Sequence, residues 1–273
     1  MNTNIYGYPH NVVSKTMRPV LIQLKNLILN LIFPPFCFGC GKEGSFFCDK
    51  CCAMLCWMPP ACFVCGRLSP IVTPGRTCLL CRKKTAIYGF ISPFTYERDH
   101  LPDTFSRVRA GEGMQFSQER TIRILIHQFK YMRISGLGNL SAKFLIEYMK
   151  KYTVVFGGHV AIVPIPLHKS RMRMRGFNQA EYIAEGLARE LSIRLLSGAL
   201  LRVKKTKPQV GLSSEERKNN IAGVFAVHDS SLLRGLSIIL VDDVKTTGAT
   251  LEEAASVLKK AGAKRIIAVT LAH

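Results

Sequence analysis

The sequence has 273 residues and a mass of 30.5 kDa, a length that predicts about two domains and at least one buried core. With 48% hydrophobic and 21% charged residues, it is neither a wholly disordered nor a collagen-like chain. Its 38 Lys and Arg residues against 18 Asp and Glu give a formal net charge of +20, which favours polyanionic partners: nucleic acid, phosphorylated small molecules or an anionic membrane.

The N-terminal part is expected to contain one helix. Residues 1–18 show no periodicity and are predicted to be a disordered extension, within which Met17 is a second candidate start. Apolar residues recur at helical spacing over 19–36 and predict an amphipathic helix. This stretch is too short and too interrupted by prolines to span a bilayer, and it lacks the features of an export signal. We therefore expect a cytoplasmic protein without a transmembrane segment, with peripheral membrane contact by residues 19–36 as an alternative.

All ten cysteines lie between Cys37 and Cys81. An exported chain would use such a cluster for disulfides, and a cytosolic chain would use it to bind metal. Two C-x-x-C turns can aim four thiolates at one cation. The sequence therefore predicts a double zinc ribbon over 37–85, with two structural zinc sites and zinc favoured over an iron–sulfur cluster. The four pairs are Cys37/Cys40, Cys48/Cys51, Cys62/Cys65 and Cys78/Cys81.

The pairing of these motifs follows from loop length. Joining the pairs in chain order gives shorter loops than interleaving them, so the first two pairs are expected to form one site and the last two the other. Cys52 and Cys56 are left over and are expected to be buried or partly buried thiols, and Cys52 could replace Cys51 as a ligand.

Residues 86–273 are expected to form an α/β domain, because apolar strand-like runs alternate with amphipathic helical patterns. The segment 97–116 is expected to be a loop. The predicted strands are His159–Pro164, Ser237–Val241 and Arg265–Leu271, and the predicted helices are Ser117–Tyr131, Asn139–Tyr152, Phe177–Leu191 and Thr250–Ala261.

The string IILVDDVKTTGAT, residues 238–250, carries the clearest chemistry. A buried strand ends at two carboxylates, and a threonine- and glycine-containing turn then opens a helix. In an open α/β sheet this is where ligands bind. Backbone N–H groups, hydroxyls and the helix dipole can enclose a phosphate, while Asp242 and Asp243 can accept hydrogen bonds from sugar hydroxyls or bind Mg²⁺. These features indicate a ribose 5-phosphate site; the alternative is that the acidic pair only caps a helix.

This string resembles the motif with which type I phosphoribosyltransferases bind 5-phosphoribosyl 1-pyrophosphate (PRPP). Three further strings, IVPIPLHKSRMRMRGFNQAEYIA (162–184), LLRVKKTKPQVGLSSEERKNNIAGVF (200–225) and LIHQFKY (125–131), resemble the ComF family. That family joins a zinc-ribbon domain to a phosphoribosyltransferase domain and is associated with natural competence. The resemblance covers roughly residues 20–273 and implies a type I phosphoribosyltransferase-like parallel sheet flanked by helices, preceded by the small Cys-rich domain.

The resemblance also assigns ligand contacts. PRPP with Mg²⁺ is expected to contact five groups of residues. The ribose and Mg²⁺ are assigned to Asp242 and Asp243, and the 5-phosphate to Lys245, Thr246, Thr247, Gly248, Ala249 and Thr250. The pyrophosphate is assigned to Pro164, Ile165, Pro166 and Leu167, with a basic loop that contains Lys169, Arg171, Arg173 and Arg175, and the flexible loop that closes over the ribose contains Lys204, Lys205, Thr206 and Gln209. A solvated basic loop without ligand contacts is the alternative for residues 169–175.

The implied reaction is displacement of pyrophosphate from PRPP by an acceptor that the sequence does not identify. Whether catalysis is retained stays open, and a glutamine amidotransferase activity is not expected, since residue 2 is Asn and residues 37–85 resemble ribbons. The alternative function is a competence protein that binds single-stranded DNA and the DNA-uptake machinery and uses PRPP only as a regulatory ligand.

Overall fold

The computed structural model describes residues 34–96, 117–131, 135–204 and 220–273. These residues belong to two compact units, which we describe separately. Residues 34–53 form the first unit and the other described residues form the second. The division between Ala53 and Met54 falls inside the segment 37–85, so the two four-cysteine groups belong to different units.

In its described residues, the first unit contains a cysteine turn and one short helix, α2 (Asp49–Ala53). Phe36 forms an isolated antiparallel bridge with Glu43, and Gly44 N–H donates to Pro35 O. Residues 34–36, the end of the predicted helix 19–36, are not helical. Proline lacks an N–H donor, which is why the pair Pro34–Pro35 cannot continue a helix. The rest of that predicted helix and the extension 1–18 lie outside the described residues.

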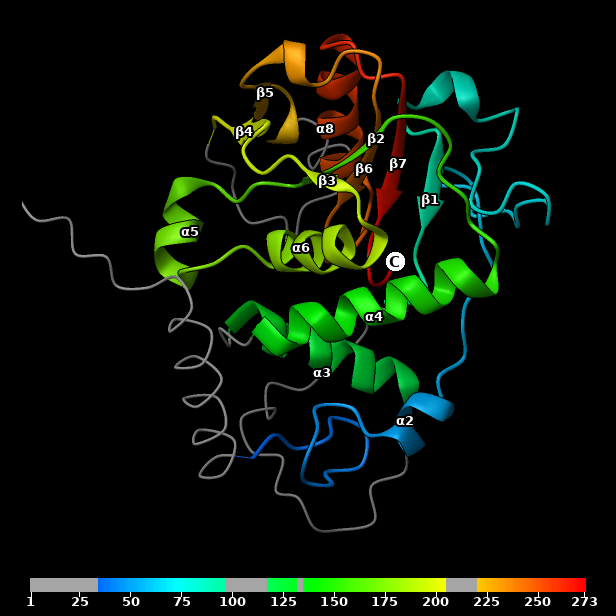
Figure 1. Cartoon of the computed structure of the whole chain (residues 1–273), viewed down its shortest axis with the longest axis vertical. Helices are drawn as coiled ribbons and strands as arrows, with labels where there is room; N and C mark the ends of the chain where they lie inside the picture. The colour runs from blue at the N-terminus through cyan, green and yellow to red at the C-terminus, as the bar shows by residue number, and fades with distance from the viewer. Residues whose placement is uncertain (1–33, 97–116, 132–134, 205–219) are drawn as a thin grey trace, which may run out of the picture. The chain divides into compact units, whose positions relative to one another are not determined.

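A five-stranded parallel sheet forms the centre of the second unit (Figure 1). Every neighbouring pair in it is parallel. Its strand order is β1–β7–β6–β2–β3, with the bounds β1 Gly89–Ile91, β7 Arg265–Val269, β6 Ser237–Val241, β2 Val160–Pro164 and β3 Arg194–Leu195.

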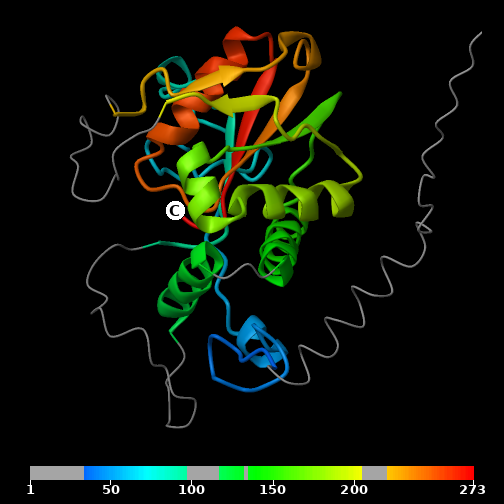
Figure 2. The ribbon, with the colours of Figure 1, turned by 90° about the vertical axis from the view of Figure 1, so that its left-hand side faces the viewer.

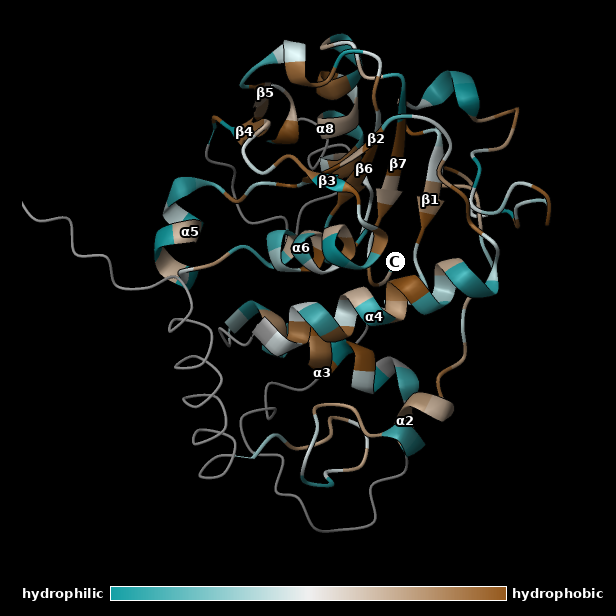
Figure 3. Ribbon diagram, viewed as in Figure 1, coloured by the Kyte–Doolittle hydropathy of each residue, from teal (hydrophilic) through white to brown (hydrophobic). Residues whose placement is uncertain are grey.

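The central strands consist of apolar runs because both of their faces are covered, as expected for a parallel sheet. Every residue of β6 is buried, and Figure 3 shows β2, β6 and β7 as largely hydrophobic ribbons. Side chains alternate between the faces. Ile238 and Leu240 join the same core cluster as Leu251 and Leu258 of α8, while Ile239 faces the opposite side.

Helices cover the sheet. Helix α8 packs on β7, α6 packs on β2 and β6, and α4 packs on α6 (Figures 1 and 2). An antiparallel pair, β4–β5, and two 3-10 turns, η1 and η3, complete the second unit. The bounds are α3 Gln118–Tyr131, α4 Ser135–Lys151, α5 Lys169–Arg175, α6 Gln179–Leu191, α8 Ala249–Lys260, β4 Leu200–Arg202, β5 Phe225–Val227, η1 Arg82–Lys84 and η3 Ser230–Leu232.

The predicted class, a parallel sheet flanked by helices, is confirmed. The strands and helices predicted within residues 86–273 are present, with ends that differ by up to four residues. The prediction of a basic loop is wrong, because residues 169–175 form helix α5. Within the described ranges no helix combines the length and the hydrophobicity needed to cross a bilayer.

Candidate functional site

The candidate site lies where β2 and β6 end side by side. These strands pair in parallel register, so that Pro164 lies opposite Val241, and the Ile165 N–H donates to Val241 O over 2.8 Å. The predicted pyrophosphate segment, Pro164–Leu167, therefore leaves the sheet beside the acidic pair, Asp242 and Asp243. Segments far apart in the chain meet here because parallel strands bring their carboxyl ends to the same edge. All peptide bonds in the segment are trans.

Each carboxylate of the acidic pair accepts one local hydrogen bond. Asp242 Oδ1 accepts from the N–H of Asp243 over 2.9 Å, and Asp243 Oδ1 accepts from the N–H of Val244 over 2.8 Å. Asp243 Oδ2 also lies 3.8 Å from Lys130 Nζ, at the end of α3. The other carboxylate oxygens can still accept hydrogen bonds or bind a cation.

Burial and a neighbouring carboxylate perturb the pKa of Asp242. Burial, and after it the neighbouring charge of Asp243, raises the pKa of Asp242 well above its usual value, although Lys130 acts in the opposite direction. The residue as a whole is half-buried, and the raised pKa comes from the burial of its carboxyl group in particular. A bound cation would relieve this repulsion.

The predicted phosphate segment forms the turn between β6 and α8. Thr246 and Thr247 are exposed, and Thr247 Oγ1 accepts from the N–H of Ala249 over 3.5 Å. Gly248 occupies the N-cap position of α8 with a φ of 80°, a left-handed conformation that glycine adopts without strain. Thr250 lies in the first turn of α8. The N-terminus of this helix thus stands directly after the exposed threonines, an arrangement that suits an anion.

Lys245 differs from the other residues of this turn. Its Nζ lies 5.1 Å from the ring centroid of Phe63 and 5.3 Å from that of Phe90. Burial lowers the pKa of the Lys245 ammonium, with an opposing effect from Cys62. The structure therefore places this charge over two aromatic rings, one of which belongs to the C-x-x-C turn Cys62–Cys65.

Helix α5 carries the four cations of the predicted basic loop. The N-cap residue His168 accepts from the N–H of Ser170, and Gly176 ends the helix with its N–H donating to Met172 O. Lys169 and Arg173 are exposed, one turn apart. These caps explain why the segment is helical despite its like charges.

Arg171 and Arg175 form the half-buried side of α5. Burial, and after it the charge of Arg175, lowers the pKa of Arg171. Burial also lowers the pKa of Arg202 in β4, which is affected by Arg171 and, in the opposite direction, by Asp242. Arg171 and Arg202 come from different elements and lie close enough to interact, and Arg202 also interacts with Asp242. A multiply charged anion would require such a group of cations.

The string RGFNQ after α5 holds the site together. Asn178 Nδ2 donates to Ile165 O over 3.0 Å, and its Oδ1 caps α6 by accepting from the N–H of Ala180. The buried side chain of Gln179 donates to the last carbonyls of α3, Phe129 O at 3.2 Å and Lys130 O at 3.3 Å. These bonds connect the pyrophosphate segment, α6 and the helix that carries Lys130.

Sequence reasoning missed three residues of this region. Lys130 and Arg202 lie in strings that resemble the family, but each is one of many basic residues in the sequence. Phe63 lies inside a C-x-x-C motif, and no sequence signal connects it with Gly248. Among the flexible-loop residues, Lys204 is exposed, while Lys205, Thr206 and Gln209 lie outside the described residues.

The cysteines form two groups of four in the predicted sequential pairing. Within each group the four Sγ atoms lie within 4.8 Å of one another. Cys40 Sγ is 3.6 Å from Cys48 Sγ, and Cys65 Sγ is 3.8 Å from Cys78 Sγ. The groups are Cys37, Cys40, Cys48 and Cys51, and Cys62, Cys65, Cys78 and Cys81.

Both groups are built on the same turn. In the first, Cys37 N–H donates to Lys42 O and Gly41 N–H to Cys37 O; in the second, Cys62 N–H donates to Arg67 O and Gly66 N–H to Cys62 O. A backbone N–H also approaches a sulfur in each group: that of Cys48 lies 3.4 Å from Cys37 Sγ, and that of Cys78 lies 3.5 Å from Cys62 Sγ.

These donors make the sulfurs suitable metal ligands. Burial tends to raise the pKa of Cys37 and Cys62, but the backbone N–H groups outweigh it and lower the two values to about 7 and about 6. Four thiolates at this spacing fit one tetrahedral cation. Of the remaining cysteines, Cys52 is half-buried, as predicted, and Cys56 is exposed; neither belongs to a group.

Residues 178–273 match the family model of the phosphoribosyl transferase domain. The chain is 30% identical to the DNA utilization protein YhgH of Escherichia coli K12 over 202 residues, which are 69% of this chain and 86% of that protein. The chain belongs to the ComF family. ComF relatives include Competence protein F of Haemophilus influenzae, 35% identical over 148 residues, and Competence protein ComFC of Bacillus subtilis, 29% identical over 192 residues.

The matched segment covers 53% of this ComF chain and 65% of the Haemophilus protein, and the Bacillus match covers 69% and 73% of the two chains. The chain therefore spans slightly less than two thirds of the length of its Haemophilus relative. Among solved structures, it is similar to a glutamine phosphoribosylpyrophosphate amidotransferase from B. subtilis, with a TM-score of 0.31, 14% identity, and coverage of 53% of this chain and 30% of that one.

Proposed function

We propose that this ComF-family protein binds PRPP with Mg²⁺ and transfers its phosphoribosyl group to an acceptor in connection with DNA uptake in the cytoplasm. The observation that supports this most strongly is the juxtaposition of Asp242 and Asp243 with the segment Pro164–Leu167 at the ends of paired parallel strands. The names of the relatives, competence proteins and DNA utilization proteins, provide the link to DNA uptake.

Each part of the site has a physical role in this proposal. The turn Lys245–Thr250 and the N-terminus of α8 hold the 5-phosphate, and Asp242 and Asp243 accept hydrogen bonds from the ribose hydroxyls. The backbone N–H of Leu167, with Arg171 and Arg202, balances the charge of the pyrophosphate; Pro164 and Pro166 have no N–H, and that of Ile165 donates to Val241 O.

The reaction breaks one bond and forms one. An acceptor lone pair attacks C1 of the ribose, the bond from C1 to the pyrophosphate oxygen breaks, and pyrophosphate leaves with that electron pair. The proton of the acceptor passes to solvent or to a carboxylate of the acidic pair. Since charge develops on pyrophosphate in the transition state, positioned cations contribute most of the catalysis.

Two kinds of metal fit the residues present. Hard carboxylate oxygens of Asp242 and Asp243 suit Mg²⁺, which would supply charge neutralisation for the phosphates. The two four-cysteine groups suit zinc in a structural role, because all four ligands are thiolates and no ligand position is open.

Titration calorimetry with PRPP, with and without Mg²⁺, tests the proposal. The Asp242→Asn/Asp243→Asn double variant is expected to lose at least about tenfold in PRPP affinity, because charge-assisted contacts are worth about 1.5–3 kcal/mol each. Asp229→Asn, which changes an exposed aspartate, is the matched control. Absence of PRPP binding by the wild type, or equal binding by the double variant, overturns the proposal.

A second candidate is a single-stranded-DNA-binding competence protein in which PRPP acts only as a regulatory ligand. Helix α5 favours it, because Lys169 and Arg173 are exposed on a segment without acidic residues and the chain carries a net charge of +20. DNA affinity should then fall steeply with salt and drop in Lys169→Gln/Arg173→Gln. A salt-independent affinity contradicts this candidate.

A further inference from the structure

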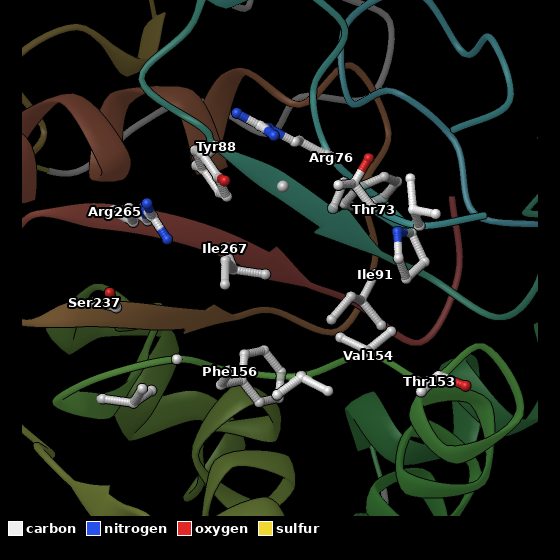
Figure 4. Close-up of a pocket in the computed structure, with 17 residues that line it drawn as sticks. Thr73, Arg76, Tyr88, Ile91, Thr153, Val154, Phe156, Ser237, Arg265 and Ile267 are labelled. Atoms are coloured by element: carbon white, nitrogen blue, oxygen red, sulfur yellow. The ribbon is translucent and has the colours of Figure 1, made fainter. Parts of the chain in front are cut away.

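A cavity of about 250 Å³ opens on the second unit, away from the acidic pair. We call it the Tyr88 cavity; it is lined by residues from the amino-terminal ends of β2, β6 and β7, from β1, and from the segments 72–76 and 153–157 (Figure 4). Ser237, at the start of β6, lines it, whereas Asp242 follows the end of that strand. The cavity therefore lies at the opposite end of β6 from the candidate PRPP site.

Two guanidinium groups flank the ring of Tyr88. Arg76 Cζ lies 5.1 Å and Arg265 Cζ 4.7 Å from the ring centroid, and Figure 4 shows both arginines beside the ring at one end of the cavity. No carboxylate lines the cavity. Among the described residues, the ion pairs involve neither arginine. Two cationic groups thus lie beside the same ring, and no acidic side chain lines the cavity to neutralise them; an anion would stabilise this arrangement.

The other end of the cavity is mainly apolar, although Thr153 and Ser237 also line it (Figure 4). Ile91, Ile267 and Phe156 form its wall, and Val154 lies beside them (Figure 4). Val72 and Val155, also lining residues, are 88% and 81% exposed. A ligand that fills the cavity therefore presents an anion to the arginines and a flat apolar part to this wall. The volume is below the roughly 300–1,000 Å³ of sites for drug-sized ligands, so the cavity holds one small ligand.

We propose that the Tyr88 cavity binds a phosphorylated nucleotide, with its phosphate on Arg76 and Arg265 and its base against Phe156 and Ile267. Each guanidinium group matches the geometry of phosphate oxygens, and bases pack well on apolar and aromatic side chains. The net charge of +20 favours such ligands over cationic or neutral ones. The nucleotide is either free or the phosphorylated end of a single strand. The inference does not depend on PRPP binding.

Calorimetric titration with dTMP, thymidine and a 5′-phosphorylated oligo(dT) tests this site. Arg76→Gln and Arg265→Gln are each expected to weaken dTMP binding at least about tenfold, because each removes a charge-assisted contact. Thymidine should bind at least about tenfold more weakly than dTMP for the same reason. Arg194→Gln is the matched control, since Arg194 is exposed on β3 at the far edge of the sheet.

Three results overturn the proposal: no binding of either phosphorylated ligand, wild-type affinity in both arginine variants, or an equal loss in Arg194→Gln. Binding of dTMP assigns the site to free nucleotides, and binding of the oligonucleotide alone assigns it to strand ends. Photocrosslinking with 4-thiothymidine 5′-monophosphate provides the location. Adducts on Tyr88 or residues 153–157 support the cavity, and adducts only on residues 242–250 contradict it.

The Asp242→Asn/Asp243→Asn variant separates this inference from the proposed function. It should retain dTMP binding in the cavity while losing PRPP binding. If it loses dTMP binding and the arginine variants keep it, the nucleotide occupies the candidate PRPP site; the inference then fails and the proposed function stands.

Discussion

The ring of Phe63 packs directly against Gly248. A β-carbon on residue 248 would come within 2.8 Å of Phe63 Cζ, so only glycine allows this approach. Phe63 lies inside the C-x-x-C turn Cys62–Cys65, and Gly248 begins α8 behind the exposed threonines. The second cysteine group therefore supports the candidate phosphate turn through one aromatic side chain.

Replacing Phe63 by alanine should weaken PRPP binding and stability together. The change removes the support of Gly248 and Lys245 and leaves a cavity, at a cost of about 3–5 kcal/mol in the free energy of unfolding. Denaturant unfolding and calorimetry with PRPP measure the two effects. Phe38→Ala is the matched control, because Phe38 occupies the same position of the first turn and stacks on Phe46 instead. Equal PRPP affinity in both variants contradicts the role of Phe63.

Metal loss should affect the two cysteine groups differently. The wild type is expected to contain two zinc ions per chain by elemental analysis, and Cys37→Ser and Cys62→Ser one each. Because Cys62 belongs to the turn that carries Phe63, only Cys62→Ser should also weaken PRPP binding, by about tenfold or more. If Cys37→Ser weakens it as much, the effect is not transmitted through Phe63.

Replacing Gln179 should lower both stability and PRPP affinity, because its side chain holds the last turn of α3. Gln179→Ala leaves the carbonyls of Phe129 and Lys130 without their buried donor, which costs about 1–3 kcal/mol of stability. PRPP affinity should fall as well, since Lys130 is the partner of Asp243. Gln118→Ala is the control: Gln118 also makes two hydrogen bonds with backbone groups, donating to Cys56 O and accepting from the Cys56 N–H. Both are solvent-exposed, so water can replace them and the loss should be smaller, about 1 kcal/mol or less. Similar losses in both variants would contradict this role.

Asp242 should make stability fall as pH rises. Its pKa is higher in the folded than in the unfolded chain, mainly through burial and then through Asp243. The folded state therefore holds the proton more tightly, and this contribution, complete below pH 3.8, is lost as pH rises toward the folded pKa. Asp242→Asn should raise the melting temperature at neutral pH and reduce this dependence.

Asp229 should give the opposite pH dependence of stability and serves as a comparison for Asp242. The hydroxyl and N–H of Ser231 lower the pKa of Asp229, so its contribution to stability disappears as pH falls. Melting temperatures of wild type, Asp242→Asn and Asp229→Asn between about pH 2 and about pH 8 test both signs, because the contribution of Asp229 is lost only below pH 3.8. An unchanged pH profile in Asp242→Asn would falsify the role assigned to its burial.

The sequence alone determined the local features of this protein. Runs such as Ser237–Val241 are apolar at every position, which predicts a buried parallel strand, and the C-x-x-C spacing predicted both cysteine groups with their pairing. The string from residue 238 to residue 250 predicted a strand, a turn and the start of a helix, which are β6, the turn and α8. Each of these signals lies within a few consecutive residues.

Only the tertiary structure brought distant residues together. Lys130 with Asp243, Phe63 with Gly248, and Arg76 with Arg265 around Tyr88 are each separated by long stretches of chain. Their contacts depend on strand order and helix packing, which no local pattern encodes. Helix α5 shows the same limit at short range, because its repelling cations predicted a loop, whereas the caps at His168 and Gly176 and the burial of one side stabilise a helix.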